Sequence, residues 1–294
     1  MSLPADLHLA LKSIPLLAAV PVAEWSIARL GGITNRNYRL CHERSGRDYV
    51  LRLPGAGGGQ YLNRPAGIHN AALAADIGIA PAVLFADETR GWQVTAFLPN
   101  AISLQSADFQ DGESLAAVGR VIGRLQRSGA AFQHEMRPFA ISDRYLSLAP
   151  EPRLQRLRQE AAWLDAAIEG SDHSLVPSHI DPNPSNFLRL PDRSLWLIDW
   201  EFSARADPFW DIGAIALDND LDEAQIDWLL AASGYAVTPQ SALRVAHFRT
   251  ALCLVAASWA FVEIAAGNET ADLRDFAEQR LSAFATGLAV LVKR

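Results

Sequence analysis

The chain has 294 residues, half of them hydrophobic and a fifth charged, which is enough to bury a substantial core in one two-lobed enzyme or two ordinary domains. Its 26 basic and 33 acidic residues give a net charge of −7 without any basic run, so binding to nucleic acid is not expected. Cys41 and Cys253 are too far apart in sequence to form a metal motif or a disulfide framework, and a cytoplasmic location is expected.

The first hundred residues are rich in strand patterns. A short apolar helix is predicted within residues 1–20, and a second helix begins at Pro65 and ends before Gly78. Alternating apolar residues and turn-forming segments predict strands in the rest of this part. The predicted strands lie within 25–53, at 83–85 and at 92–97.

From about residue 100 onward the apolar spacing is helical. The predicted helices include 115–125, a single helix through 154–168, and a last helix at 270–292. Thr238 and Pro239 form a cap and a first-turn proline, which open a long helix that runs through Phe261. The apolar run 251–262 is too short to span a bilayer, so we expect a buried helix and no membrane span.

The motif with the clearest chemistry is segment 179–186, HIDPNPSN, followed by Asp199 at the end of an apolar strand. Asp181 and Asn186 are five positions apart, and Asn186 and Asp199 are thirteen apart. Phosphoryl transfer needs a carboxylate that accepts the proton of the attacking hydroxyl. It also needs an amide oxygen and a second carboxylate that hold Mg²⁺ against the phosphates. We therefore predict Asp181 as the catalytic residue and Asn186 and Asp199 as metal ligands.

The segment between these residues predicts a β-hairpin. Two short apolar runs, 187–190 and 195–198, flank the turn-forming segment 191–194. A hairpin reverses the chain, so Asp199 is expected to lie near Asn186. The alternative is that the two aspartates are solvated loop acids and that the asparagine is a cap.

Five segments of the chain, in the same order, resemble the aminoglycoside phosphotransferase and choline kinase superfamily, which has a kinase-like fold. They are 30–38 (LGGITNRNY), 49–55 (YVLRLPG), 62–64 (LNR) with 78–81 (GIAP), 179–186, and 198–202 (IDWEF) with 207–211 (DPFWD). Within the superfamily the chain most resembles the bacterial choline/ethanolamine kinases, and the resemblance covers residues 20–290.

The resemblance implies an α+β, bilobal protein-kinase-like fold with a β-rich N-lobe at 1–98 and a mainly helical C-lobe at 99–294. It implies transfer of the γ-phosphate of ATP, with Mg²⁺, to the hydroxyl of a small cationic alcohol, choline or ethanolamine. Aminoglycosides and thiamine are the alternative acceptors within the superfamily. A nucleotide-binding module without turnover is the alternative of another class.

The resemblance also implies a loop that folds over the nucleotide phosphates. Its predicted cofactor-binding residues are Gly31, Gly32, Thr34 and Asn35. Glycines let the backbone approach the phosphates closely, and the N–H groups and the threonine hydroxyl can donate to oxygen atoms. The alternative is a plain turn between two strands.

Two more cofactor-binding residues, Arg52 and Phe97, follow from the resemblance. Arg52 lies on the strand where protein kinases place a lysine, and its guanidinium could grip two phosphate oxygens; the alternative is an exposed strand arginine. The backbone at Phe97 would pair with adenine. The chain departs from the family at Gly67, where a glutamate usually orients the strand cation. Another acid could replace it, the phosphates alone could hold Arg52, or activity could be weakened.

On the substrate side, the resemblance matches Trp259 to a tryptophan of the choline cage, with Ala256 where a second tryptophan is usual. Aromatic faces attract a quaternary ammonium by about 0.5–2 kcal/mol per ring; core packing is the alternative for this tryptophan. Glu201 is expected near metal or substrate, with a surface role as the alternative. His179 is expected to brace the catalytic loop, and Asp211 to cap the backbone of that loop.

Overall fold

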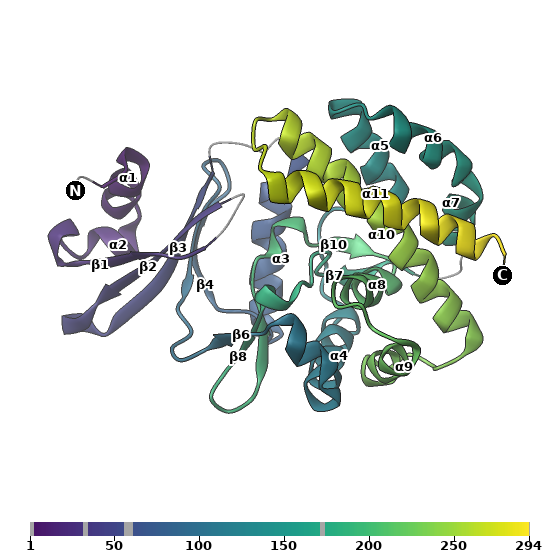
Figure 1. Ribbon diagram of the computed structural model, residues 1–294. Helices are drawn as coiled ribbons and strands as arrows, with labels where there is room; N and C mark the ends of the chain where they lie inside the picture. The colour runs from purple at the N-terminus through teal and green to yellow at the C-terminus, as the bar shows by residue number, and fades with distance from the viewer. Residues whose placement is uncertain (1–2, 32–34, 56–60, 171–173, 294) are drawn as a thin grey trace.

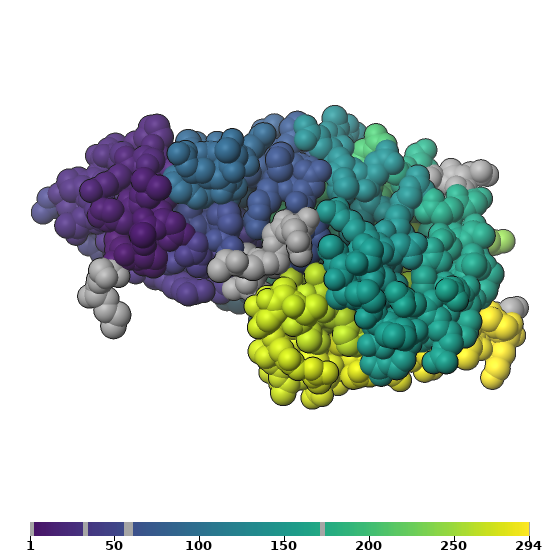
Figure 2. All heavy atoms as spheres, turned by 90° about the horizontal axis from the view of Figure 1, so that it is seen from above, coloured from purple at the N-terminus to yellow at the C-terminus, as the bar shows by residue number. Residues whose placement is uncertain are grey.

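The computed structural model describes residues 3–31, 35–55, 61–170 and 174–293 (Figure 1). An antiparallel sheet with two short helices forms one end of the molecule, and a mainly helical part forms the other. The predicted α+β fold is therefore confirmed. Seen from above, the N-terminal elements form one end of an elongated molecule, and the C-terminal helices run along one side of the helical part (Figure 2).

The N-terminal sheet has five antiparallel strands in the order β1-β2-β3-β5-β4. Their bounds are β1 Ser26–Arg29, β2 Asn35–His42, β3 Arg47–Pro54, β4 Val83–Asp87 and β5 Trp92–Ala96. Arg52 of β3 pairs in register with Asn37 of β2 and Gln93 of β5, so it occupies the middle of the sheet. Helices α1 (Ala5–Ser13) and α2 (Pro15–Ala18) contribute buried leucines to a separate hydrophobic core with this sheet.

Helix α3 (Arg64–Asp76) connects the sheet to the helical part. It begins with the side chain of Asn63, which accepts a hydrogen bond from the Ala66 N–H, and with Pro65 in its first turn. Its buried Ala71 and Ala74 belong to the core of the C-terminal part. Its Asn70 donates to the Ser203 carbonyl oxygen at 2.9 Å. Helix α3 lies before residue 98 and yet packs on the core of the C-terminal part. The predicted lobe boundary between residues 98 and 99 therefore stays a prediction.

The C-terminal part consists of helices around two small antiparallel sheets. The helices are α4 Gly112–Gln126, α5 Pro138–Leu148, α6 Pro152–Glu160, α7 Ala162–Glu169, α8 Phe209–Asp218, α9 Glu223–Ala232, α10 Pro239–Ala265 and α11 Ala271–Leu291. The strands are β6 Ile102–Ser103, β8 Phe187–Arg189 and β9 Leu195–Leu197 in one sheet, and β7 Val176–Ser178 with β10 Ala204–Ala206 in the other. The long helices α10 and α11 pack side by side (Figure 1).

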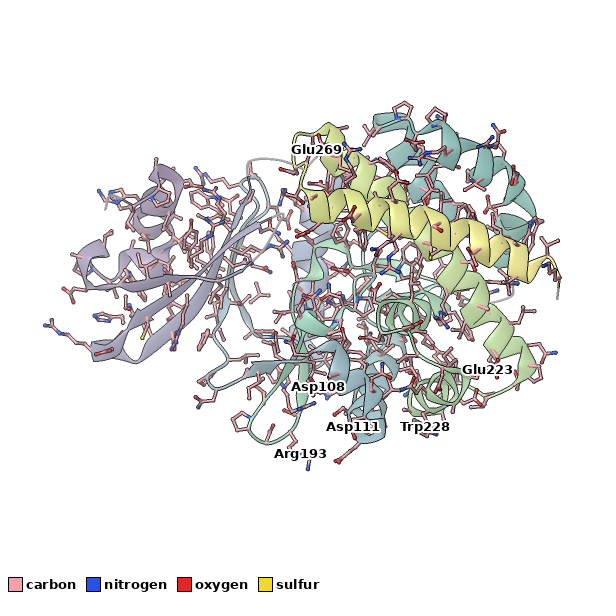
Figure 3. The ribbon with its side chains drawn as sticks, in the orientation of Figure 1. Asp108, Asp111, Arg193, Glu223, Trp228 and Glu269 are labelled. Atoms are coloured by element: carbon pink, nitrogen blue, oxygen red, sulfur yellow. The ribbon has the colours of Figure 1, made fainter. Side chains whose placement is uncertain are left out.

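Local signals set several of these elements. Strands β8 and β9 form the predicted hairpin, with Arg193 in a left-handed conformation (φ 68°) at its tip (Figure 3). The side chain of Asp111 caps α4 by accepting from the Ser114 N–H at 2.8 Å (Figure 3). Thr238 caps α10 in the same way, as its sequence predicts.

One helix prediction was wrong. The predicted helix through 154–168 is two helices, α6 and α7, which meet at Ala161. Leu154, Leu164 and Ile168 are nevertheless all buried, so the apolar spacing indicated burial correctly although it did not mark the break. Apolar spacing reports which face a helix buries, and it contains no information about a turn that keeps the same face inward.

Helix α10 contains the apolar run 251–262. It is long and apolar enough to cross a membrane by length and composition, but 61% of its most apolar window is buried inside the molecule. A buried core helix passes the same test, so the indication of a span is weak.

Candidate active site

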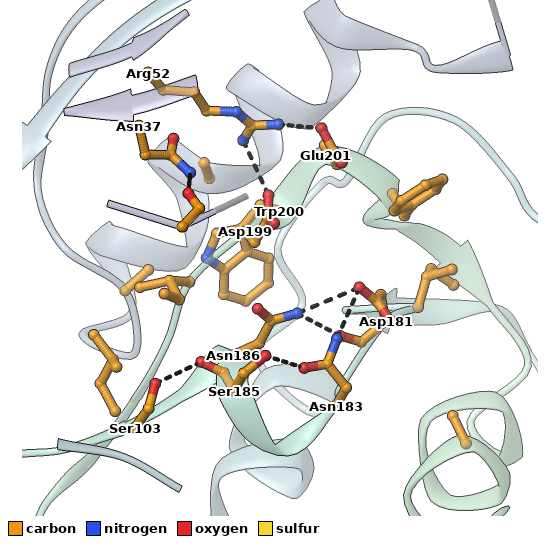
Figure 4. Close-up of a pocket in the computed structure, with 18 of the residues that line it drawn as sticks. Asn37, Arg52, Ser103, Asp181, Asn183, Ser185, Asn186, Asp199, Trp200 and Glu201 are labelled. Carbon is orange, nitrogen blue, oxygen red and sulfur yellow. Dashed lines mark hydrogen bonds and ion pairs between the residues drawn. The ribbon is translucent and has the colours of Figure 1, made fainter. Parts of the chain in front are cut away.

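A cavity of about 1010 Å³ lies between the sheet and the helical part (Figure 4). Its lining includes residues of β3 and β5, of the segments around Asp181 and Asp199, and of helices α8, α10 and α11. The predicted site residues that line it are Gly31, Arg52, Phe97, Asp181, Asn186, Asp199, Glu201 and Trp259. Residues that are far apart in the sequence therefore share one cavity that is large enough for a nucleotide and a second small molecule.

The loop before Asp181 is held in a strained conformation. Ile180 has a φ of 76°, which is rare for a β-branched residue and costs of order 1–3 kcal/mol. Asp211 accepts the N–H groups of His179 and Ile180 at 3.0 and 2.8 Å, and the indole of Trp210 donates to the Ile180 carbonyl at 2.9 Å. The start of α8 thus clamps both sides of the Ile180 residue. Asp211 lies where the resemblance places the capping aspartate.

His179 is fully buried, and its Nε2 lies 2.9 Å from the Ile198 carbonyl oxygen. Burial lowers the pKa of His179 to about 4, so the ring is neutral near pH 7 and donates this hydrogen bond. Its ring also contacts Trp200 edge-on, with the ring centroids 4.7 Å apart. These contacts hold the loop against the strand that leads to Asp199. Within the described part of the chain, His179 is not among the residues that line the cavity.

Asp181 lies at the centre of a polar group (Figure 4). Its Oδ2 accepts from the side-chain amides of Asn183 at 3.1 Å and Asn186 at 3.3 Å, and its carbonyl accepts from Asn186 at 2.9 Å. Burial, and then the neighbouring Asp199 carboxylate, raise the pKa of Asp181 to about 8. A cation bound at Asp199 would offset this repulsion and favour the ionised form that accepts a proton.

Asn186 and Asp199 are close, as the hairpin predicted. The Ile198 N–H donates to the Asn186 carbonyl oxygen at 3.0 Å. Asp199 itself has left-handed backbone angles (φ 66°, ψ 61°), which turn its carboxylate into the cavity. The Asn186 amide nitrogen faces Asp181, so its oxygen is the atom left for a metal ion. One amide oxygen and one carboxylate suit Mg²⁺, so Asn186 and Asp199 would hold this ion beside the phosphates of a bound nucleotide.

Arg52 points from the sheet to the segment after β9. Its Nη2 lies 2.5 Å from Glu201 Oε2, and its Nη1 lies 3.4 Å from Asp199 Oδ1 (Figure 4). The side-chain amide of Asn35 also donates to Glu201 Oε2. Glu201 is only 6% exposed, so the surface alternative for this residue is wrong.

Gly67 explains how Glu201 comes so close to Arg52. Residue 67 is buried in α3, directly against the turn η6 (Trp200–Phe202). A Cβ at this position would lie 3.1 Å from the Trp200 carbonyl oxygen. Three alternatives were open for the acid that the helix lacks. The structure agrees with the first, because another carboxylate, that of Glu201, lies beside Arg52.

Of the other predicted nucleotide residues, Gly31 and Phe97 line the cavity on its sheet side. The Gly31 carbonyl accepts from the Asn37 side chain at 3.0 Å (Figure 4). Gly32 and Thr34 lie outside the described residues. Phe97 lines the cavity, but its N–H donates to the Asp48 carbonyl at 3.2 Å, so adenine would need a different backbone group of this segment.

Trp259 of α10 lines the cavity from the helical side, next to Ala256. Its indole N–H donates to the Tyr61 hydroxyl at 3.0 Å, and this hydroxyl donates to Glu263 at 2.5 Å. The ring also contacts Phe276 of α11 edge-on. Trp259 is thus a fixed aromatic face at the cavity wall and also a contact of the core.

Two charged residues at the helical end of the cavity were not predicted. Asp218 ends α8, and Arg280 lies on α11; their side chains form an ion pair at 2.6 Å. Asp218 stands seven positions after Asp211 in the same helix, and this spacing on one helix face could have indicated it. No local signal marks Arg280, because its partner is 62 positions away.

Known proteins are similar to this chain in sequence and in fold. Residues 26–244 match the model of the APH phosphotransferase enzyme family. Protein LicA of Haemophilus influenzae is 31% identical over 209 residues, which are 68% of this chain and 60% of that protein, so the chain spans less than two thirds of this relative.

Two solved structures resemble nearly the whole chain. A choline/ethanolamine kinase family protein from Mesorhizobium loti is 28% identical with a TM-score of 0.80, covering 97% of this chain and 98% of that one. Choline kinase LicA from Streptococcus pneumoniae is 22% identical with a TM-score of 0.83, covering 97% and 100%. The family match over residues 26–244 covers most of the chain and shows that it belongs to the APH phosphotransferase enzyme family.

Proposed function

We propose that this protein is an ATP- and Mg²⁺-dependent kinase that transfers the γ-phosphate to the hydroxyl of a small cationic alcohol, with choline and ethanolamine as the first candidates. The observation that carries the proposal is the convergence of Asp181, Asn186 and Asp199 at one cavity that Arg52 also lines. The similar solved structures are those of a choline/ethanolamine kinase family protein and a choline kinase, which supports this class of acceptor.

In the proposed reaction the acceptor hydroxyl lies against Asp181. Its oxygen attacks the γ-phosphorus, the bond to the β-phosphate oxygen breaks, and the hydroxyl proton passes to Asp181 while ADP leaves. Mg²⁺ would neutralise charge on the phosphates, and Asn186 and Asp199 would hold it. Arg52, held by Glu201, would contact phosphate oxygens. Because the transition state is loose, positioning by these residues supplies most of the rate.

The test is ADP release measured with ATP, Mg²⁺ and a panel of choline, ethanolamine, thiamine and an aminoglycoside. We expect turnover with an amino alcohol and a fall of about 10²–10⁴ in kcat for Asp181→Asn, with ATP affinity little changed. Turnover restricted to thiamine or the aminoglycoside would move the acceptor to one of those classes. ATP binding without ADP release for any alcohol would indicate a nucleotide-binding module instead.

A further inference from the structure

The helical end of the cavity contains an ion pair that none of the site residues above requires. Arg280 Nη2 donates to Asp218 Oδ1 at 2.6 Å, and the two side chains are 18% and 30% exposed. Both residues line the same cavity as Asp181. The ion pair therefore borders the same space that an acceptor bound at Asp181 would occupy.

The charges of the described cavity lining divide into two groups. Arg52, Asp199 and Glu201 contact one another on the nucleotide side. On the acceptor side the charged lining residues are Asp181, Asp218 and Arg280. Asp181 is used in the proposed reaction. The other carboxylate on the acceptor side is Asp218, and the positive charge of Arg280 already balances the negative charge of Asp218. A purely cationic acceptor would therefore meet a guanidinium at this end of the cavity.

The nearby Glu263 does not change this balance. It is 1% exposed, and its oxygens accept from the Tyr61 hydroxyl and from the Asn268 amide at 2.6 Å. Within the described part of the chain it is not among the residues that line the cavity. Its carboxylate positions Tyr61, and the Tyr61 hydroxyl in turn positions the indole of Trp259 at the cavity wall.

Arg280 is placed to bind an anion. A guanidinium has five N–H donors in a planar fork; the hydrogen bond to Asp218 Oδ1 uses one of them, and the buried thiol of Cys253 is a second hydrogen-bonding neighbour. The guanidinium carbon lies 5.1 Å from the ring centroid of Phe276, which itself contacts Trp259 edge-on. An aromatic face, a carboxylate and a guanidinium thus stand together at one wall.

We propose, on the basis of the proposed kinase function, that among amino alcohols the preferred acceptor is one that also carries a carboxylate, and that Arg280 binds this carboxylate. The ammonium group of such a zwitterion would lie beside Asp218 and the ring of Trp259. Its carboxylate would pair with the guanidinium fork, which suits carboxylate geometry. Each charge of the ligand then has a partner, whereas choline and ethanolamine leave Arg280 facing a cation.

The experiment compares acceptors that differ only by the carboxylate. L-Serine is ethanolamine with a carboxylate, and L-homoserine is 3-amino-1-propanol with a carboxylate, so the two pairs test two chain lengths. We measure kcat/KM for all four and for choline with the wild type and with Arg280→Met, which keeps the apolar stem and removes the charge. The expected result is that at least one carboxylated acceptor exceeds its partner in the wild type. This preference should fall by about tenfold or more in Arg280→Met, while choline gains.

Two further variants serve as controls. Arg280→Lys keeps the charge without the fork and should retain part of the preference. Arg274→Met removes an arginine of the same helix whose partner is the exposed Glu269, and it should leave the acceptor ratios unchanged. Thermal unfolding of each variant reports whether the fold is intact.

The inference is overturned if neither carboxylated acceptor exceeds its partner, or if the preference survives in Arg280→Met. Should no alcohol be phosphorylated, the proposed function fails separately. In that case, calorimetric titration of L-serine and ethanolamine into wild type and Arg280→Met still tests whether Arg280 binds the carboxylate. Equal affinities in the two proteins for both ligands would count against it.

Discussion

Gly67 of α3 lies directly against the backbone of Glu201. A Cβ at position 67 would be 3.1 Å from the Glu201 Cα and 3.3 Å from its carbonyl oxygen. Most side chains at position 67 would therefore push the Glu201 segment away from Arg52. The glycine at position 67 leaves the room that Glu201 needs to reach Arg52, so Glu201 takes the place of the acid that the helix lacks.

Gly67→Ala tests this close approach. In an ordinary helix the change would gain about 1 kcal/mol, but here the methyl group meets backbone atoms that cannot rotate away. We expect the free energy of unfolding in urea to fall by about 1 kcal/mol and the KM for ATP to rise. The control is Gly112→Ala in α4, whose Cβ would have ordinary contact, 3.4 Å, with the side chain of Trp228. Equal stability changes at the two positions would contradict the argument.

Glu201→Gln tests which ligand depends on Glu201. The change keeps the shape but removes the charge that faces Arg52 at 2.5 Å, so Arg52 should shift toward Asp199, 3.4 Å away. We expect the KM for ATP to rise by about tenfold and the acceptor KM to change little. Asp48→Asn, which breaks the Arg39 pair of the same sheet, is the control. A rise confined to the acceptor KM would assign Glu201 to the substrate, as the sequence suggested.

Asp199→Asn tests the metal site. Asparagine tolerates the left-handed backbone of this residue (φ 66°), so the change removes the charge with little added strain. We expect affinity for Mg·ATP to fall by at least about tenfold, because Mg²⁺ prefers a carboxylate ligand. Calorimetry at several Mg²⁺ concentrations measures it. An unchanged affinity with an unchanged Mg²⁺ dependence would remove Asp199 from this role.

Trp259 is tested by two substitutions. Trp259→Ala removes the aromatic face and should raise the KM for choline by about tenfold, since one cation–π contact contributes about 1–2 kcal/mol. Trp259→Phe keeps a ring but loses the hydrogen bond to Tyr61, so it should retain much of the choline affinity. The KM for ATP should hardly move in either variant. If both variants bind choline like the wild type, the ring is a core residue only.

The buried His179 predicts a dependence of stability on pH. Its pKa is about 4 in the folded protein, below the ordinary value of 6.5, because burial disfavours the charged ring. The stability it contributes is present above pH 6.5 and is lost as the pH falls toward 4. We expect the difference in unfolding free energy between wild type and His179→Gln to shrink over this range.

Asp211 has the opposite effect on the same pH range. Burial raises its pKa to about 6, so its contribution decreases as the pH rises from about 4 to 6. Since Asp211 is present in both proteins, the comparison of wild type with His179→Gln cancels it. A difference that stays constant from pH 7 to 4 would mean that the ring is not held neutral.

The sequence alone determined the elements whose signals are local. Local signals set the caps at Asn63, Asp111 and Thr238, the hairpin before Asp199 and the strands of the first part. In each case the residues that give the signal lie close together in the sequence. Asn186 and Asp199 belong to the same class, because a short hairpin brings them together, and Asp181 is linked to Asn186 within five residues.

Tertiary structure decided the rest, because contacts between distant segments leave no periodic trace in the sequence. Arg52 and Glu201 are 149 positions apart, and only the packing of α3 on the segment after β9 makes them partners. The ion pair of Asp218 and Arg280 depends on how α11 lies against α8 and α10, and the φ of Ile180 depends on the clamp from Asp211. The family pattern indicated a missing acid at Gly67, and the packing of backbone against backbone shows what occupies its place.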